Sequence, residues 1–186
     1  MSFKHCFPPV VDAHTRVLIL GSLPGEASLA HQQYYAHKQN KFWHLVGEVI
    51  GVDLPALDYE ARLQTLLDHR IGLWDVVAQA RREGSLDGNI RDHAGNDLIT
   101  LIERLPALQA IAFNGGTASR IGERILGVDA QRLEILRLPS SSPAYASMNF
   151  ATKLVAWRAL DAFSTTPDTP ANAATSTRKR PAISPG

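Results

Sequence analysis

The alternation of short apolar runs with helical patterns restricts the fold of this chain more than any other feature. Apolar runs bounded by turn residues predict buried strands, and apolar residues at intervals of three and four predict helices. Strands are expected at 16–20, 71–78 (with a turn after it), 108–115 and 132–138. Helices are expected at 41–50, 59–70, 96–105 (capped by Asn96), 116–126 and 148–162. This order predicts an α/β protein of three layers, α/β/α, with a short, mostly parallel central sheet.

Composition excludes several classes of protein. The chain has 186 residues, of which 45% are apolar, as in a globular protein with one main core. No apolar run approaches the roughly 18 residues that a membrane-spanning helix needs, and the N-terminus lacks the order of a secretion signal. We therefore expect no membrane partner and a cytoplasmic location. Cys6 is the only cysteine, which excludes an intramolecular disulfide and a four-cysteine metal site.

The composition changes near residue 164. The segment 164–186 contains four prolines and almost no large apolar side chain, which is typical of disorder. The predicted organisation is one α/β domain over 1–163 followed by this tail, in a chain expected to be a monomer. The "RKR" at 178–180 is either a non-specific phosphate contact or a solvated cluster. A net charge of +1 argues neither for nor against binding to nucleic acid.

Functional groups of a parallel sheet gather at the carboxyl ends of its strands. The segments expected there are "GSLPGEAS", "DVVAQARREGSLD", "FNGGT" and "LPSSSPAY". The first does not match a phosphate loop, a dinucleotide fingerprint or a nucleophile elbow, so Ser22 is a poor candidate nucleophile. Asp75 is a candidate acid or base, or else a cap for the following turn.

Several side chains in these segments have both a functional and a structural interpretation. Tyr34 and Tyr35 suit stacking on a base, or are simply half-buried. His37 suits a proton shuttle or a phosphate contact, or else a capping role. The amide of Asn114 offers a donor and an acceptor to a heterocycle, or satisfies loop backbone. The serines and prolines of "LPSSSPAY" permit close approach of a phosphate, or form an ordinary turn.

Taken together, these segments resemble the uracil-DNA glycosylase superfamily. The ordered set "GSLPGEASL", "YYAHKQNKFW", "GLWDV", "REGSLDGNI", "FNG" and "LPSSSPA" looks most like its hypoxanthine-DNA glycosylase (DNA-deoxyinosine glycosylase) branch, over roughly residues 15–160. The resemblance implies an enzyme that flips a deaminated base out of DNA and hydrolyses its N-glycosidic bond. It implies no cofactor and no metal ligands.

The resemblance also implies roles for individual residues. Asn40 matches the catalytic asparagine of the hypoxanthine branch, and Tyr35 matches the aromatic residue on which the flipped base stacks. Asn114 is expected to line the base pocket, together with Leu23 and His37. The residues expected to grip DNA beside the lesion are Ser140, Ser141, Ser142 and Pro143, after Pro139.

Three positions depart from the relatives' patterns. Leu23 stands where mismatch-specific uracil relatives carry asparagine, and Leu138 stands where the fast uracil enzymes carry histidine. Both differences favour hypoxanthine over uracil. Lys38 replaces a proline usual in the hypoxanthine branch, which leaves the backbone near Asn40 less defined.

Other functions remain open from the sequence. The alternatives are a G/U mismatch-specific uracil-DNA glycosylase, a non-catalytic module that binds lesions in nucleic acid, and a small α/β hydrolase using Ser22 or Asp75. The sequence does not rank hypoxanthine, uracil and xanthine securely. It also leaves open the partner base, the preference for single- or double-stranded DNA, and any contribution of the basic tail.

Overall fold

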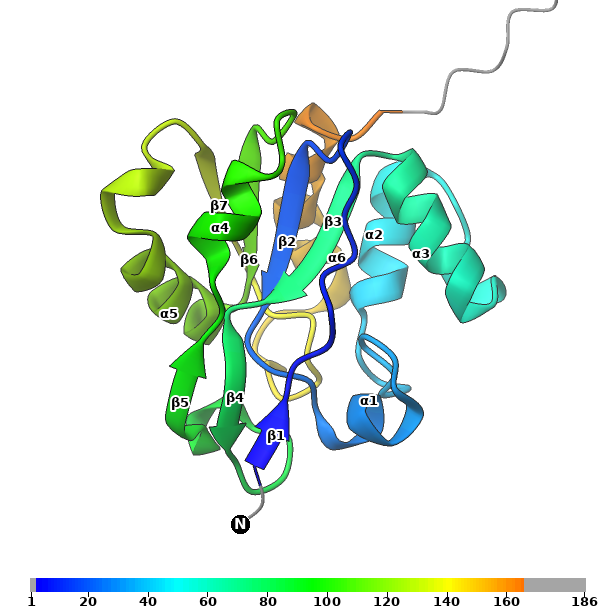
Figure 1. Cartoon of the computed structure of the whole chain (residues 1–186). Helices are drawn as coiled ribbons and strands as arrows, with labels where there is room; N and C mark the ends of the chain where they lie inside the picture. The colour runs from blue at the N-terminus through cyan, green and yellow to red at the C-terminus, as the bar shows by residue number, and fades with distance from the viewer. Residues whose placement is uncertain (1–2, 166–186) are drawn as a thin grey trace, which may run out of the picture.

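The computed structural model describes residues 3–165, without the side chains of residues 89, 91 and 92. Its central sheet is parallel and has the strand order β3-β2-β6-β7. The strands are β2 (Val17–Gly21), β3 (Ile71–Asp75), β6 (Ala110–Asn114) and β7 (Glu134–Leu138). Figure 1 shows this sheet between two groups of helices, which confirms the predicted α/β class.

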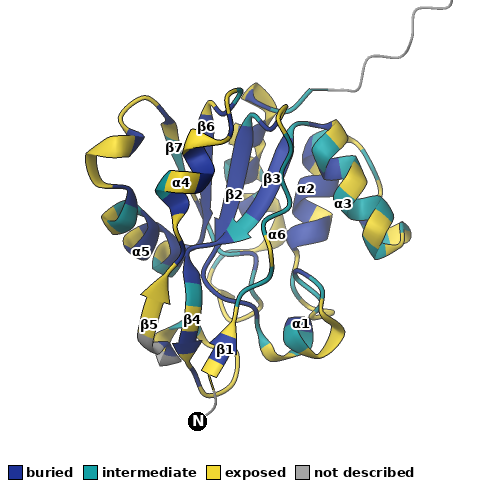
Figure 2. Ribbon diagram, in the orientation of Figure 1, coloured by how far each residue is buried: buried dark blue, intermediate teal, exposed yellow. Residues whose placement is uncertain are grey.

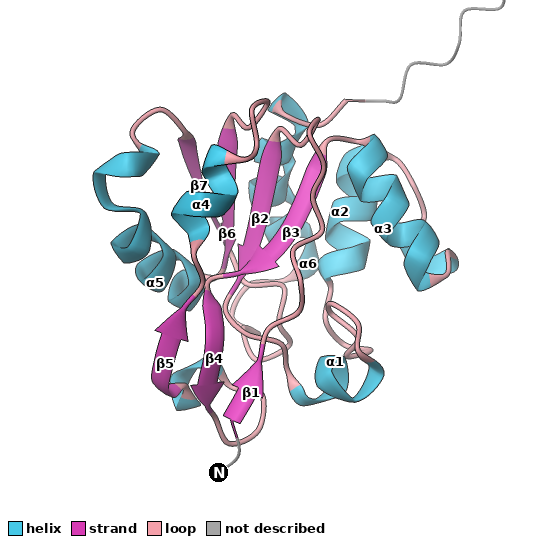
Figure 3. Ribbon diagram, viewed as in Figure 1, coloured by secondary structure: helices cyan, strands magenta, loops and turns pink. Residues whose placement is uncertain are grey.

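Helices cover both faces of the central sheet. One face carries α2 (Phe42–Ile50), α3 (Tyr59–Asp68) and α6 (Phe150–Trp157), and the other carries α4 (Leu98–Glu103) and α5 (Gly116–Leu126). Figure 3 shows these layers by secondary structure. Because side chains alternate along a strand, Leu18 and Leu20 pack with α4 and α5 while Val17 and Ile19 pack with α2 and α6.

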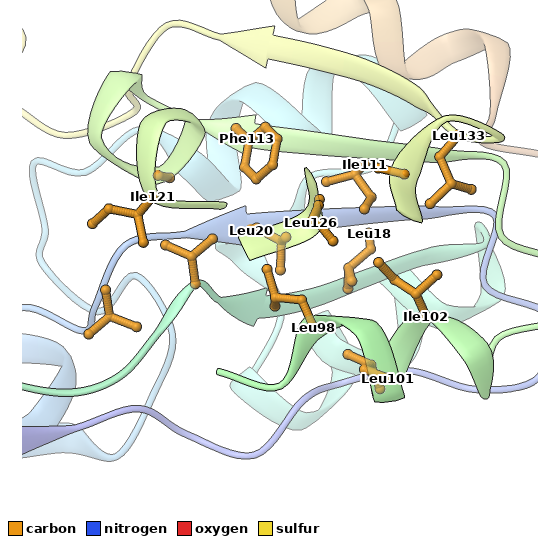
Figure 4. Packing of buried hydrophobic residues seen from close by; sticks show 14 of the residues in the cluster. Leu18, Leu20, Leu98, Leu101, Ile102, Ile111, Phe113, Ile121, Leu126 and Leu133 are labelled. Atoms are coloured by element: carbon orange, nitrogen blue, oxygen red, sulfur yellow. The ribbon is translucent and has the colours of Figure 1, made fainter. Parts of the chain in front are cut away.

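Burial on both faces explains why the central strands are almost entirely apolar. All five residues of β2 and all five of β6 are buried, as the dark ribbons of Figure 2 show. In the close-up of one cluster (Figure 4), Leu18 of β2 and Ile111 of β6 lie in the same group of side chains as Ile102 of α4 and Leu133. The two strands therefore form a rigid base for the loops that follow them.

The strand order reverses direction at β2. From β2 the chain crosses to β3 on one side, and β6 pairs with the opposite edge of β2. Such a switch point opens a crevice between the loops that follow the two strands, and ligands of parallel sheets bind there. The loops after Gly21 and Asn114 are therefore the expected walls of a site.

The expected single strand at 71–78 is wrong, because it is two strands in different sheets. β3 ends at Asp75, and β4 (Val77–Arg81) pairs antiparallel with β1 (Phe3–His5) and β5 (Arg91–Gly95). Figure 1 shows this small sheet beyond the arrowheads of β2 and β3. Val76 and Val77 are both fully buried, so the apolar pattern gives no break at the bend between the strands.

Two predicted helix boundaries also differ. Asp97, not Asn96, caps α4, because its side chain accepts a hydrogen bond from the Thr100 amide at 3.1 Å. Asn96 is buried and donates to the Asp75 carbonyl instead. The last helix is shorter than expected: α6 begins after the cap Asn149 and continues as a 3₁₀ segment, Arg158–Ala162.

The strands β1 and β5 and one α-helix had no counterpart in the prediction. Helix α1 (Glu26–His31) follows β2 and was not expected. The predicted tail at 164–186 falls, from residue 166 onward, outside the described residues. No helix in the range 3–165 is long and apolar enough to cross a membrane.

Candidate active site

A cavity of about 940 Å³ lies at the carboxyl end of the central sheet, at the switch point between β2 and β6. Its walls are residues from the segments 21–28, 34–40, 85–88, 114–120 and 140–145, together with Asp75. All nine predicted site residues line it: Leu23, Tyr35, His37, Asn40, Asn114, Ser140, Ser141, Ser142 and Pro143. The structure thus brings them together, while their individual roles remain predictions.

Tyr35 is held in an unusual backbone conformation. Its φ is +54°, a left-handed value that is uncommon for an aromatic residue. Backbone strain of this kind is often found at functional sites. Its ring stacks on Phe42, with 3.9 Å between centroids and 14° between planes. One ring face is therefore covered, and only the opposite face is available to a base. Tyr34, by contrast, is buried and donates to the Pro8 carbonyl, so its role is structural.

Asn40 lies at the start of α2 and has one side of its amide engaged. Its carbonyl oxygen accepts a hydrogen bond from the Phe42 amide at 3.0 Å. Within the described residues, its NH2 group has no acceptor, and the side chain lines the cavity. The carbonyl therefore fixes the orientation of the amide, and the NH2 group is the half that is ready to bind a substrate.

His37 lies at the exposed part of this wall. Its Nδ1 accepts from the Gln39 amide at 3.1 Å, and its carbonyl accepts from the Asn40 amide at 2.9 Å. These contacts shape the turn that carries Asn40. The exposed imidazole edge remains suitable for the predicted contact with a phosphate.

Asn114 and Ser141 form a buried pair that joins the ends of β6 and β7. The Ser141 amide donates to the Asn114 carbonyl oxygen, and the Asn114 NH2 donates to the Ser141 hydroxyl, each at 2.9 Å. The Ser141 carbonyl accepts from the Lys41 amide at 3.0 Å. Ser141 therefore ties the loop to both the sheet and α2, while Ser140, Ser142 and Pro143 are more exposed.

Replacing Asn114 with alanine should lower the free energy of unfolding by about 2 kcal/mol, because it leaves the buried Ser141 amide without an acceptor. Urea unfolding would measure the loss. Ser141→Ala is the matched control: it removes the hydroxyl but keeps the amide contact, so it should cost only about 1 kcal/mol. Equal losses in the two variants would contradict this account of the pair.

The loop that contains Leu23 is held by a buried arginine. Arg82 is 1% exposed, and its guanidinium donates to the carbonyls of Leu23, Pro24 and Gly84. Leu23 itself is buried, packs into the cluster that includes Phe113, and presents an apolar side chain to the cavity. The first loop is therefore fixed before any ligand binds.

Two carboxyl groups, Asp75 and Asp87, line the same cavity. Asp87 accepts from the Ser22 hydroxyl at 2.6 Å and lies 3.7 Å from Arg82. The pKa of Asp75 is raised from 3.8 to about 7, chiefly by burial and in addition by the negative charge of Asp87, while Arg82 acts to lower it. Burial also raises the pKa of Asp87. The cavity thus contains one carboxyl that is partly protonated near neutral pH.

The described residues contain no group of three or more His, Cys, Asp or Glu side chains arranged to hold a metal ion. The polar side chains that line the cavity include amides, hydroxyls, carboxyls, the imidazole of His37 and the guanidinium of Arg120, and aromatic rings lie beside them. They are suited to hydrogen bonding, stacking and proton transfer.

A family model described as the uracil DNA glycosylase superfamily matches residues 8–161 of the chain. The chain belongs to this superfamily. The match spans every residue that lines the cavity.

Individual superfamily members are similar over most of their length. A hypoxanthine DNA glycosylase of Methanosarcina acetivorans is 46% identical over 141 residues, which cover 76% of this chain and 87% of that protein. One from Methanosarcina barkeri is 46% identical over 112 residues, 60% of this chain and 71% of that protein. The solution NMR structure of a proposed uracil DNA glycosylase from Methanosarcina acetivorans superposes with a TM-score of 0.76, at 41% identity, over 86% and 97% of the two chains.

No individual role was expected from the sequence for Asp87, which lines the cavity, or for Arg82, which holds the loop that contains Leu23. Both lie in the stretch "RREGSLDGN", which was expected near the carboxyl end of a strand only as a segment. No pattern in the sequence distinguishes the buried Arg82 from the exposed Arg81 next to it. Asp75 was among the candidates, but its burial beside Tyr35 could be seen only in the structure.

Proposed function

We propose that this chain is a monofunctional DNA glycosylase that removes deaminated bases from DNA, with hypoxanthine preferred over uracil. The observation that carries the proposal is the convergence of Asn40, Tyr35 and Asn114 on one cavity at the switch point of the sheet. The two relatives at 46% identity, both named hypoxanthine DNA glycosylases, support the choice of base.

The reaction breaks the bond between the sugar C1′ and a ring nitrogen of the base, so positive charge grows on the sugar and negative charge on the base. Asn40 cannot remove a proton near neutral pH, but its unengaged NH2 can donate to the leaving base, and the second lone pair of its carbonyl can hold a water. Preoriented donors of this kind act by electrostatics and positioning. The start of α2 adds a positive dipole beside the site.

The composition of the cavity wall supports hydrolysis by water rather than attack by an amine. Lysine amines form covalent imines with sugar carbonyls, and none of the described residues that line the cavity is a lysine. The product is then a free base and an intact abasic strand, which is what a monofunctional glycosylase leaves.

The preference for hypoxanthine follows from the apolar wall at Leu23. Its buried side chain offers no hydrogen bond to a uracil anion, and the cavity has room for a bicyclic base beside Tyr35. The Asn114 amide, although bound to Ser141, retains the second lone pair of its carbonyl for the N–H of a lactam.

The decisive experiment compares oligonucleotides that contain a single inosine, uracil or xanthine, as single strands and opposite each partner base. We expect inosine to be excised at least tenfold faster than uracil in single-turnover reactions, with strand scission only after alkali. Faster excision of uracil would instead assign the chain to the mismatch-specific uracil branch. Tight binding without scission would identify a lesion-binding module.

The unit proposed to carry this activity is the domain over 1–163 as a monomer. Every described residue that lines the cavity lies within residues 21–145, inside this proposed domain. The contribution of the "RKR" cluster to DNA binding and the cytoplasmic location stay predictions from the sequence.

A further inference from the structure

A buried carboxyl group in the cavity wall lacks the hydrogen bonds that such groups normally make. Asp75 ends β3, is 4% exposed, and has an oxygen, Oδ2, without a partner in the described chain. The hydroxyl of Tyr35 is also buried and makes no hydrogen bond of normal geometry to a described residue, although the Asn114 side chain lies close enough to lower its pKa. Buried polar groups are nearly always satisfied, so exceptions point to a ligand or a catalytic task. The unpartnered oxygen of Asp75 belongs to the wall of the cavity, where a bound group can satisfy it.

The backbone holds this carboxyl in a fixed place. Asp75 is paired with Gly21 across β2 and β3, and its carbonyl accepts from the Asn96 side chain at 2.7 Å. A Cβ atom on Gly21 would lie 2.7 Å from Asp75 Oδ1 and 2.9 Å from the Tyr35 hydroxyl. Both groups therefore occupy the space that a side chain at residue 21 would fill. Only glycine at this position leaves that space open.

The surroundings of Asp75 favour its protonated form. Burial has the largest effect on its pKa, and the negative charge of Asp87 acts in the same direction. Among the described residues, Arg82 is the cation that lowers its pKa, and it opposes both. The resulting pKa of about 7 leaves a transferable proton on Asp75 at neutral pH.

The other titratable groups that face Asp75 are uncharged at neutral pH. Burial raises the pKa of the Tyr34 and Tyr35 hydroxyls and of the Cys6 thiol, and the charge of Asp75 raises each of them further. Asp75 is therefore the one acid among these groups whose proton can move in the neutral range.

We propose that Asp75 is the general acid that protonates N7 of a purine base as the base leaves. This inference rests on the proposed glycosylase function and explains how the same site favours hypoxanthine. The Asp75 proton moves to N7, and the C1′–N9 bond breaks with its electron pair passing to the base, which departs neutral. Water then adds to C1′ and releases a proton to solvent, and solvent reprotonates Asp75. Uracil has no N7, so this proton transfer is open to purine bases only.

The test pairs a protein change with a substrate change. Asp75→Asn keeps the shape of the side chain but has no proton to transfer, and 7-deaza-2′-deoxyinosine lacks the nitrogen that accepts it. We expect each change alone to slow single-turnover excision from the same duplex at least tenfold. Combining them should add less than threefold, and Asp75→Asn should change uracil excision less than threefold.

The pH profile supplies a measurement that a purely structural role would not alter. Inosine excision by the unaltered protein should fall tenfold per pH unit above about pH 7, and Asp75→Asn should remove this slope. Asp87→Asn should shift the descending limb to lower pH, because it removes the negative charge that raises the pKa of Asp75.

Several outcomes would overturn the inference. Equal slowing of inosine and 7-deazainosine by Asp75→Asn would mean that the residue positions other groups and does not protonate N7. Rapid excision of 7-deazainosine by the unaltered protein would reject it without any variant. In both cases the unaltered protein still excises inosine, so the proposed function stands. A protein that excises no inosine would overturn both.

Discussion

Replacing Asn40 with alanine should slow single-turnover excision of hypoxanthine about 100-fold, the usual loss when one preoriented donor is removed from a reacting centre. The NH2 of Asn40 has no acceptor within the described residues, so its substitution removes a contact that only the substrate can make. The measurement is the excision rate at saturating enzyme from a duplex with a single inosine.

Alanine at this position also removes the acceptor for the Phe42 amide at the start of α2, which costs about 1 kcal/mol of stability. Asn40→Ser is the matched control, because a serine hydroxyl can accept from the amide two residues further on, as the Asn40 carbonyl does, but has no NH2 group. Both variants should lose activity to a similar degree, while the serine variant should unfold close to the unaltered protein. Retention of excision in either variant would move the catalytic role to another residue.

Replacing Asp75 with asparagine should stabilise the protein above pH 7. The pKa of Asp75 rises from its ordinary value of 3.8 to about 7 on folding, chiefly through burial. The folded state therefore holds this proton more tightly, and its contribution to stability is complete below about pH 4 and lost as the pH rises toward 7. A pKa rise of this size corresponds to at most about 4 kcal/mol of unfolding free energy. Asparagine at this position avoids that loss because its side chain does not ionise.

Urea unfolding at pH 5 and pH 8 measures this difference. The gain from Asp75→Asn should be clearly larger at pH 8 than at pH 5. Asp97→Asn is a suitable control, because hydrogen bonds from Thr100 lower the pKa of this exposed cap. Its substitution should therefore give no gain at high pH. Destabilisation by Asp75→Asn at both pH values would mean that the carboxyl makes structural contacts.

The sequence predicts the parts of the fold that depend on local patterns. The run at 17–20 is apolar at every position because both faces of β2 are covered, and such a run bounded by turn residues is typical of a buried strand. The division between β3 and β4 was missed because Val76 and Val77 continue the apolar run through the bend. Only the pairing of β4 with the distant β1 and β5 reveals that a new sheet has begun.

The site residues that could be predicted are those that lie in short, recognisable sequence motifs. Tyr35 and Asn40 lie between an expected strand and the expected helix at 41–50, and Asn114 lies near the end of the expected strand at 108–115. Because functional groups gather at the carboxyl ends of parallel strands, these residues were expected at one site. The part that could not be predicted depends on side chains distant in sequence. Arg82 reaches the carbonyl of Leu23, 59 positions earlier in the chain, and the unsatisfied oxygen of Asp75 becomes evident only when every neighbour is placed.

The pairing of Asn114 with Ser141, together with the contact between Lys41 and Ser141, has a consequence for how a lesion is found. These bonds and those of Arg82 hold the walls of the cavity in place without DNA, so closure of a loop around the base supplies little of the driving force. The base must leave its stack largely by spontaneous opening of the duplex. Weakly paired lesions are then captured more often than strongly paired ones, and the thermal breathing of the double helix becomes the first stage of discrimination.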